Sequence, residues 1–216
     1  MAGRGDRRGS APARRILDDL RRARALVIHP RDEEGAALLE QLRRLGCAVS
    51  LVWPPPAALP PEIDTLFIQL DDAQVMHLLP SIEEAEPAVI AIVAYESPTS
   101  LKAIADVNAH GVLNKPLHPR GVLTQFALAR YRRGYEGRLI SKINRLEETM
   151  KGRRTVEKAV RLLVDLNRID EDAAYKMLRD RATAARVPMA SVAESVVAAH
   201  EAMSGLGLRI ALADKT

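Results

Sequence analysis

The sequence predicts an α/β domain with a doubly wound sheet of five parallel strands, followed by a long helix and a bundle of three short helices. Short apolar runs alternate with amphipathic helical runs between residues 25 and 114. A helical pattern begins after Pro119 and continues to Gly152 without an evident break. Three more helical runs, separated by very short breaks, occupy residues 154–197.

The five predicted strands are short and mostly apolar, which is typical of strands covered by helices on both faces. They are Ala25–His29, Cys47–Trp53, Ile63–Leu70, Ala88–Ala94 and Gly111–Asn114. The helices expected between them are Glu33–Leu45, Val75–Ala85 with an interruption at Pro80, and Thr99–Asn108. Residues 16–24 are expected to form one or two helical turns. The functional edge of such a sheet lies at the carboxyl ends of its strands.

The three C-terminal runs carry apolar residues at helical spacing. The first run ends near Asn167, Asp170 is the predicted N-cap of the second, and Pro188 suits the first position of the third. The residues expected to be buried are Val156, Ala159, Val160, Leu163 and Leu166, then Ala173 or Ala174, Met177, Leu178 and Ala182, then Met189, Val192, Ala193, Val196 and Val197. Helices this short are stable only when they pack on one another.

Composition restricts the class of protein. The chain has 216 residues, of which 47% are hydrophobic and 3% aromatic, so its core is expected to be aliphatic. Cys47 is the only cysteine, which excludes a disulfide framework and a cysteine metal cluster. No apolar run approaches the roughly 20 residues that span a membrane, and no signal-type segment follows the basic N-terminus. We expect a cytoplasmic protein that does not associate with membranes.

The net charge of +4 hides an asymmetry between two parts of the chain. Residues 25–125 contain 6 Lys or Arg and 13 Asp or Glu, whereas residues 130–161 contain 11 basic and 4 acidic residues. A basic helical segment favours a polyanionic partner, most simply a nucleic acid. A solvated charged helix face is the alternative interpretation.

The segment Gly111–Leu117, with its Lys115-Pro116 pair, resembles the end of a response-regulator receiver domain, and the resemblance covers about residues 25–125. The flavodoxin-like receiver fold accepts a phosphoryl group on an aspartate with the help of Mg²⁺. The receiver phosphosite is degenerate here, because Gln69 stands at the acceptor position and only Lys115 is retained.

Other receiver positions also differ. His29-Pro30 stands where receivers carry an acidic pair, although Asp32 and Glu33 follow shortly, and Val93 or Ala94 replaces the usual hydroxyl residue. Asp71 and Asp72 are the alternative acceptors, but a shift of two or three residues would carry them past the strand end. We therefore predict a pseudo-receiver that is not phosphorylated, with no metal site and no cofactor.

The long helix contains a narrow apolar stripe. Leu139, Ile143, Leu146 and Met150 recur at spacings of 4, 3 and 4, as in the seam of a coiled coil. The sequence therefore predicts a homodimer. An amphipathic helix folded back on its own domain is the alternative.

The C-terminal segment is similar to the ANTAR module, the three-helix RNA-binding domain of AmiR/NasR-type transcription antiterminators. The matching positions are Ala159, Leu162, Leu163, Val164, Ala174, Tyr175, Leu178, Arg179, Ala182, Val192 and Ala193. The family usually has Lys-Gly at Val160-Arg161 and Met at Val164 and Thr183, and its turn glycine is replaced near Asn167-Arg168. These departures leave the spacing intact.

Further strings carry the same resemblance over about residues 20–203, among them Trp53–Pro56 and Tyr95–Pro98. The expected domains are a disordered basic tail (1–15), a pseudo-receiver (16–125), a dimerisation helix (126–153), an ANTAR domain (154–204) and a flexible tail (205–216). The resemblance implies a non-enzymatic antiterminator that binds leader mRNA hairpins. It also implies control through sequestration by a cytoplasmic amide-sensing binding protein.

Recognition of RNA loops uses cations for phosphates and planar groups for unpaired bases. The candidate residues are Lys158, Arg161, Arg168, Tyr175, Lys176, Arg179 and Arg186. Positions 175, 179, 182 and 186 are spaced to share one helix face, although Tyr175 could equally be a half-buried packing residue.

Two other functions remain open at this point. A phosphorylation-dependent regulator that binds DNA would need the missing phosphoacceptor and a recognition helix. A dimeric interaction protein with no nucleic-acid role would leave the basic bias of residues 130–161 without a purpose.

Overall fold

The computed structural model describes residues 10–70 and 73–206 and divides into two compact units, Met1–Arg138 (unit 1) and Leu139–Thr216 (unit 2). Helix α5 (Pro119–Asn167) contributes its first part to unit 1 and the remainder to unit 2. Asp71 and Asp72, the alternative phosphoacceptors, lie outside the described residues, as do positions 1–9 and 207–216 of the two predicted tails.

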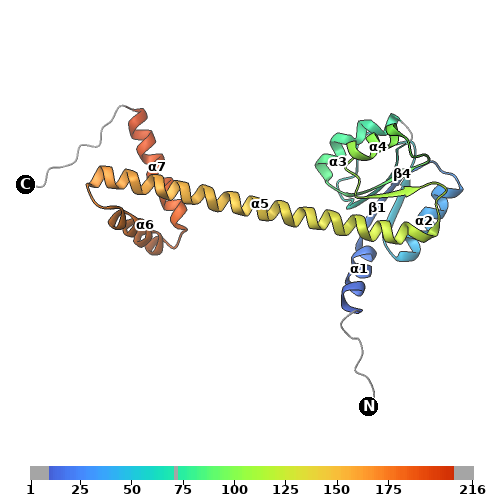
Figure 1. Cartoon of the computed structure of the whole chain (residues 1–216), viewed down its shortest axis with the longest axis horizontal. Coiled ribbons are helices and arrows are strands. Elements are labelled where there is room, and N and C mark those ends of the chain that lie inside the picture. Colours follow the sequence, from blue (N-terminus) through green and yellow to red (C-terminus); the bar gives the residue numbers. More distant parts are fainter. Residues whose placement is uncertain (1–9, 71–72, 207–216) are drawn as a thin grey trace, which may run out of the picture. The chain divides into compact units, whose positions relative to one another are not determined.

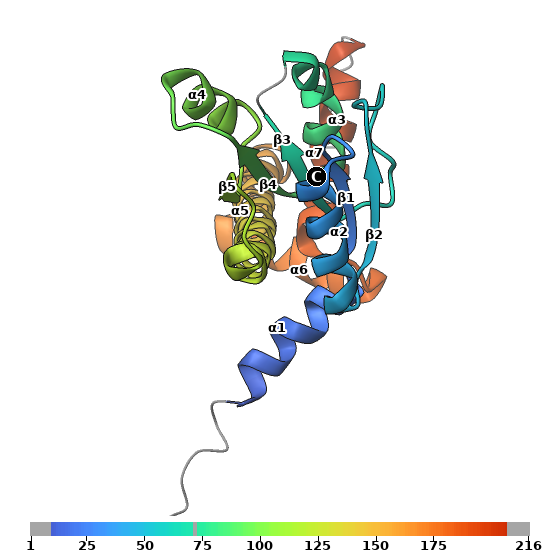
Figure 2. The same ribbon diagram turned by 90° about the vertical axis from the view of Figure 1, so that its right-hand side faces the viewer.

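Unit 1 is built on a parallel sheet (Figure 1). Its strand order is β2-β1-β3-β4-β5 (Figure 2), which confirms the predicted fold class. The strands are β1 (Arg24–Ile28), β2 (Ala48–Val52), β3 (Thr65–Gln69), β4 (Ala88–Val93) and β5 (Gly111–Asn114). All six residues of β4 are buried, because helices cover both faces of the sheet.

Two groups of helices cover the two faces (Figure 2). Helices α1 (Ser10–Arg22), α2 (Glu33–Leu45) and the first part of α5 share one core with the sheet. The other core contains η1 (Ala73–Leu78), α3 (Leu79–Ala85) and α4 (Pro98–Asp106). Phe67 of β3 and Phe126 of α5 meet edge to face, with ring centroids 5.4 Å apart.

Local sequence signals set several helix ends in unit 1. Asp32 caps α2 by accepting a hydrogen bond from the Gly35 N–H at 2.8 Å, and Gly46 ends the same helix with a φ of 89° that suits glycine. Pro80 lies in the first turn of α3, so the helix predicted over 75–85 is divided into a 3-10 segment and an α-helix, as the proline suggested.

One expectation for unit 1 was wrong in detail. Helix α1 begins at Ser10, so residues 10–15 are helical instead of disordered. Leu20 anchors its carboxyl end in the core, whereas Ile16 and Leu17 stay exposed because α1 extends away from the sheet (Figure 2). In the first part of α5 the buried residues Val122, Phe126 and Ala129 follow spacings of 4 and 3 and face the sheet.

Unit 2 packs the remainder of α5 against α6 (Glu171–Ala185) and α7 (Met189–Gly205). Its buried core is small, with Ala159, Val160, Ala174, Leu178 and Ala193 at the centre. Partly buried apolar side chains pack around this centre: Val156, Leu163, Val164, Ile169, Met189, Val192, Val196 and Val197. The three-helix bundle predicted for residues 154–204 is therefore present.

Two predictions for the bundle need correction. Met177 was expected in the core but is 50% exposed, because the buried stripe of α6 runs through Ala174, Leu178 and Ala182 at a spacing of four. Pro188 precedes the first residue of α7 and acts as its N-cap instead of occupying the first helical position. Asp170 caps α6 as predicted, accepting the Ala173 N–H at 2.7 Å. Within the described part of the chain, no helix is both long and apolar enough to cross a membrane.

Candidate functional site

The carboxyl edge of the sheet holds both residues of the predicted degenerate phosphosite. Gln69 is the last residue of β3, and Lys115 follows β5, where its backbone N–H bonds to the Val93 carbonyl oxygen at 2.9 Å. Val93, one of the two residues expected at the position of the receiver hydroxyl, is 2% exposed at the end of β4.

Lys115 has a carboxylate partner that sequence reasoning missed. Its Nζ lies 3.1 Å from Oε2 of Glu34, and the other oxygen of Glu34 accepts the Leu117 N–H at 2.9 Å. Burial by itself would raise the pKa of Glu34, but the hydrogen bond from Leu117 and the Lys115 ammonium together lower it. A detectable signal was the pair Glu33-Glu34 in the first turn of the helix that follows β1, since this turn lies at the same edge.

Three potential metal ligands also meet at this edge. One ligand atom each of His29, Asp32 and Glu34 lies within 4.8 Å of the others, a grouping that the sequence did not reveal. The protein already occupies these atoms. His29 Nδ1 lies 2.9 Å from the Pro30 carbonyl oxygen, and Oδ1 of Asp32 accepts the Gly35 N–H. A metal ion would have to compete with these hydrogen bonds and with the Lys115 ammonium.

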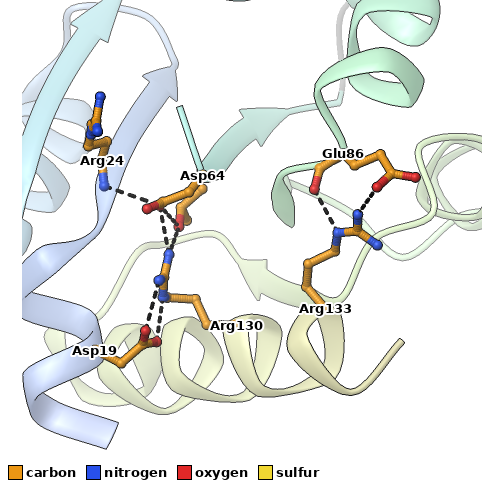
Figure 3. A network of polar contacts seen from close by, with 7 residues as sticks. Asp19, Arg24, Asp64, Glu86, Arg130 and Arg133 are labelled. Atoms are coloured by element: carbon orange, nitrogen blue, oxygen red, sulfur yellow. Dashed lines mark hydrogen bonds and ion pairs between the residues drawn. The ribbon is translucent and has the colours of Figure 1, made fainter. Parts of the chain in front are cut away.

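The opposite edge of the sheet anchors α5 through Arg130 (Figure 3). Its guanidinium donates two hydrogen bonds to Asp19 of α1, at 2.7 and 3.0 Å, and one to Asp64 at 2.6 Å. Asp64 also accepts the N–H of Arg24 at 3.1 Å. The hydrogen bond from Arg130 is the main reason that the pKa of Asp19 is lowered, although burial opposes it.

Two more arginines of α5 are engaged in the same way. Arg133 bonds to the backbone oxygen of Glu86 at 2.6 Å and forms an ion pair with its carboxylate (Figure 3), and Arg132 donates to the His110 carbonyl oxygen at 3.0 Å. Three of the basic residues counted in the segment 130–161 are therefore bonded inside unit 1. Fewer of these cations are available to bind a polyanion than the composition of the segment suggested.

In unit 2 the predicted seam of α5 is exposed. The exposed fractions of Leu139, Ile143, Leu146 and Met150 are 41%, 52%, 56% and 56%. Large apolar side chains in a continuous exposed stripe are unusual on a monomer and typical of an interaction surface.

All seven candidate RNA-binding residues are exposed in the structure. Tyr175 is 46% exposed, so its ring is accessible at the surface of α6. Lys158 is bonded to Glu201 of α7 at 2.6 Å, and Arg179 lies 4.0 Å from Asp180. Ala182 shares the spacing of this face but is 7% exposed and packs inward, as expected for a residue of the buried stripe of α6.

Tyr175 also forms part of a cavity within unit 2 that sequence reasoning missed. The cavity has a volume of about 400 Å³ and lies between α5, α6 and α7. The lining residues are Glu148, Thr149, Gly152, Arg153, Val156, Glu157, Tyr175, Met189 and Ala190. A Cβ atom added to Gly152 would lie 3.3 Å from Cβ of Ala190, so the glycine permits a close approach of α5 and α7. A glycine inside a long helix was the available signal.

Comparison with known proteins identifies both parts of the chain. Residues 23–130 match the family model described as AmiR, N-terminal, and residues 144–197 match the ANTAR domain. The aliphatic amidase regulator of Pseudomonas aeruginosa is 30% identical over 188 residues, covering 86% of this chain and 96% of that protein. The chain belongs to the AmiR–ANTAR family. This confirms the predicted resemblance, and the family is one of regulators, not of enzymes.

One solved structure with a TM-score above 0.5 agrees with the fold of this AmiR–ANTAR protein. The response regulator StyR, in a low-resolution structure, superposes with a TM-score of 0.51 at 14% identity, covering 80% of this chain and 99% of that chain. A signal receiver domain of a modulated diguanylate cyclase from Desulfovibrio desulfuricans G20 gives a TM-score of 0.43 at 17% identity over 52% of this chain and 96% of that one. The likeness to StyR concerns the fold alone.

Proposed function

We propose that this protein is a transcription antiterminator that binds hairpins of a leader mRNA through unit 2. The observation that carries the proposal is the ANTAR match over residues 144–197, which contain all seven exposed candidate residues. A bound hairpin that excludes a terminator hairpin would let transcription continue.

The chemistry of the exposed residues suits this role. Arg161, Lys176 and Arg179 present charge for phosphates, and the exposed ring of Tyr175 offers a stacking surface for an unpaired base. Lys158 would exchange its bond to Glu201 for a phosphate. Side chains that already lie at the surface can make these contacts without unfolding the small core of unit 2.

The acting species in this proposal is a parallel homodimer that pairs through Leu139, Ile143, Leu146 and Met150. When these four residues take the a and d positions, Lys142 falls at a g position and Glu147 at the following e position. In a parallel pair, g and the next e of the partner lie side by side, so Lys142 would meet the partner's Glu147 with opposite charge. This charge pattern favours parallel pairing.

The proposed input is a protein partner instead of a phosphoryl group. Gln69 cannot form an acyl phosphate, and the Lys115 ammonium is engaged by Glu34. Treatment with acetyl phosphate and Mg²⁺ should therefore leave the intact mass unchanged. A gain of one phosphoryl group that disappears in Asp71→Asn or Asp72→Asn would contradict this part of the proposal.

We propose further that an amide-sensing binding protein in the cytoplasm sequesters the regulator. Such a protein, encoded beside this gene, should lower RNA binding when added in equimolar amount, and a short aliphatic amide should restore it. This mode of control would be excluded if the sensor protein does not bind the regulator, or if no amide tested restores RNA binding.

The proposed function is tested by selection against RNA. A library of RNA hairpins with one stem and a randomised loop is incubated with the full-length protein, and the retained hairpins are compared with duplex DNA in a gel shift. We expect a defined loop sequence to be enriched and duplex DNA to bind only weakly. Preference for a duplex DNA sequence would instead support the DNA-binding regulator.

A further inference from the structure

We infer that the cavity between α5, α6 and α7 is a subsite for one unpaired base of the bound RNA, and that this base carries an amino group on its pairing edge. The inference rests on the proposed function and adds a location and a class of base to it. It concerns residues on three consecutive helices that meet in the folded unit 2.

The walls of the cavity suit a flat aromatic group. Tyr175 contributes a ring that is 46% exposed, and Val156, Met189 and Ala190 contribute apolar surface. The volume of about 400 Å³ accommodates a nucleobase together with part of its ribose. Stacking of a base on an aromatic ring stabilises single-stranded RNA complexes whatever the identity of the base.

The polar residues of the cavity restrict which base fits. Glu148 and Glu157 are exposed carboxylates, which accept hydrogen bonds and donate none. Adenine, cytosine and guanine each present an exocyclic amino group to such acceptors, whereas uracil carries carbonyl oxygens in place of amino groups and has only its ring N3–H to donate. Arg153, also exposed and in the lining, supplies a cation for the adjacent phosphate.

The proposed dimer seam does not use this cavity. None of its four residues, Leu139, Ile143, Leu146 and Met150, is among the lining residues. The positions on α5 that line the cavity include Thr149, Gly152 and Val156, which lie on the side of the helix that faces α7. Two copies can therefore pair through these four residues, with Thr149, one heptad after Lys142, at a g position that borders the seam.

The test combines changes in the RNA with changes in the protein. The probe is the hairpin enriched from the randomised-loop library, in which each loop base is replaced by uracil in turn. For the wild type we expect one loop position where uracil lowers affinity about tenfold or more, consistent with the loss of one stacked and bonded base. This position should hold adenine, cytosine or guanine in the enriched hairpin.

Filling the cavity should abolish the effect of that one position. Thr149 is exposed and lines the cavity, so Thr149→Phe places a ring in the space without changing the buried core. Sedimentation should show that the variant is still a dimer, because position 149 borders the proposed seam. This variant should bind the enriched hairpin more weakly and no longer distinguish uracil at the sensitive position. Ser195→Phe is the matched control, because Ser195 is exposed on α7, bonds to a carbonyl four residues earlier as Thr149 does, and lies outside the lining.

The choice of base is tested separately with the double variant Glu148→Gln, Glu157→Gln. Its amide groups can donate hydrogen bonds to the carbonyl oxygens of uracil. The loss of affinity caused by uracil at the sensitive position should therefore be smaller than in the wild type, and the loss at the other loop positions should be unchanged. With 2-aminopurine at the sensitive position, fluorescence should be quenched by the wild type and by Tyr175→Phe, and less by Tyr175→Ala.

The outcomes separate this inference from the proposed function. Enrichment of no hairpin would overturn the proposed function itself. If a hairpin is enriched, but uracil at every loop position lowers affinity equally in the wild type and in Thr149→Phe, that result would overturn the cavity subsite alone. A sensitive position whose uracil cost is unchanged in the double glutamine variant would overturn the role of the carboxylates.

Discussion

The arginines of the two units differ in what surrounds them. Arg130 in unit 1 has a side chain that is 15% exposed and is bonded to two carboxylates from other elements, whereas the side chain of Arg179 in unit 2 is 63% exposed. Residue type and local charge are similar at the two positions. The difference lies in acidic partners distant in sequence. Asp19 and Asp64 hold the guanidinium of Arg130 in ion pairs inside unit 1, so it is not free to bind a ligand. Surface charge available to a ligand therefore cannot be counted from composition.

The apolar residues of α5 show the same contrast. Val122 and Phe126 are buried against the sheet of unit 1, whereas Ile143 and Leu146 of unit 2 are exposed on the same helix. Along α5, the part in unit 1 buries its apolar stripe against the sheet, and the part in unit 2 presents its stripe outward. This contrast makes unit 2 the binding half of our account, and the following variants are designed to break or sharpen it.

The largest expected effect is loss of the dimer in Ile143→Asp. A carboxylate at the centre of the seam would be buried without a partner, so the variant should sediment as a monomer where the wild type is a dimer. Asn144→Asp adds the same charge at the neighbouring position outside the seam and should remain dimeric. A wild type that is monomeric at micromolar concentration would show that the coiled-coil interpretation is wrong.

Next in size is the loss of stability in Arg130→Met. Removing the guanidinium leaves Asp19 and Asp64 without their shared partner, and we expect a loss of about 2–3 kcal/mol, less than for a fully buried pair because both carboxylates are partly exposed. Arg179→Met should change stability by less than about 0.5 kcal/mol. Urea unfolding followed by circular dichroism compares the two. Equal losses would remove the distinction between anchors and surface cations.

A similar effect on binding, not on stability, is expected for Tyr175→Ala. Loss of a stacked base should weaken binding of the enriched hairpin by about 1–3 kcal/mol, and Tyr175→Phe should retain most of the affinity. Fluorescence anisotropy measures the affinity, and a melting curve checks the fold. If the alanine variant unfolds, Tyr175 is a packing residue instead.

The salt dependence of RNA binding should respond to Arg179→Ala. One phosphate contact fewer should lower the slope of log affinity against log salt by about one unit. The slope should stay unchanged in Arg43→Ala, an exposed arginine on α2 of unit 1. If the slope falls in Arg43→Ala and stays at the wild-type value in Arg179→Ala, then unit 1 and not unit 2 contacts the phosphates.

The smallest effect concerns acid stability. Because Arg130 lowers the pKa of Asp19 in the folded protein, this carboxylate stabilises unit 1 above its unfolded pKa of about 3.9 and loses that contribution as the pH falls below it. Asp19→Asn should therefore lower stability at pH 7 and lower it less at pH 3. Urea midpoints at the two pH values test this, and an equal loss at both would exclude the ion pair as the cause.

Much of the fold could be predicted from the sequence because its signals are local. The alternation of strands and helices, the Asp170 cap and the position of Gln69 at a strand end all follow from short segments. The same holds for the exposed seam, since a spacing of 4, 3 and 4 defines one face of a helix wherever the helix lies.

The remaining features depend on pairs distant in sequence. Nothing near Arg130 indicates Asp19, which lies 111 residues earlier, and nothing near Lys115 indicates Glu34. Met177 is exposed because α6 buries Ala174, Leu178 and Ala182, a choice of face that depends on the packing of α6 against its neighbours. The cavity could not be predicted for the same reason, although Gly152 marked a close approach of helices.

Hydrogen exchange of the full-length protein, with and without saturating enriched hairpin, tests the contrast between the units most directly. We expect RNA to slow exchange in α6 and in α5 around residues 148–161, and to leave β1, β3 and β4 unchanged. Slowed exchange confined to the carboxyl edge of the sheet, near Gln69 and Lys115, with none in α6, would contradict the account.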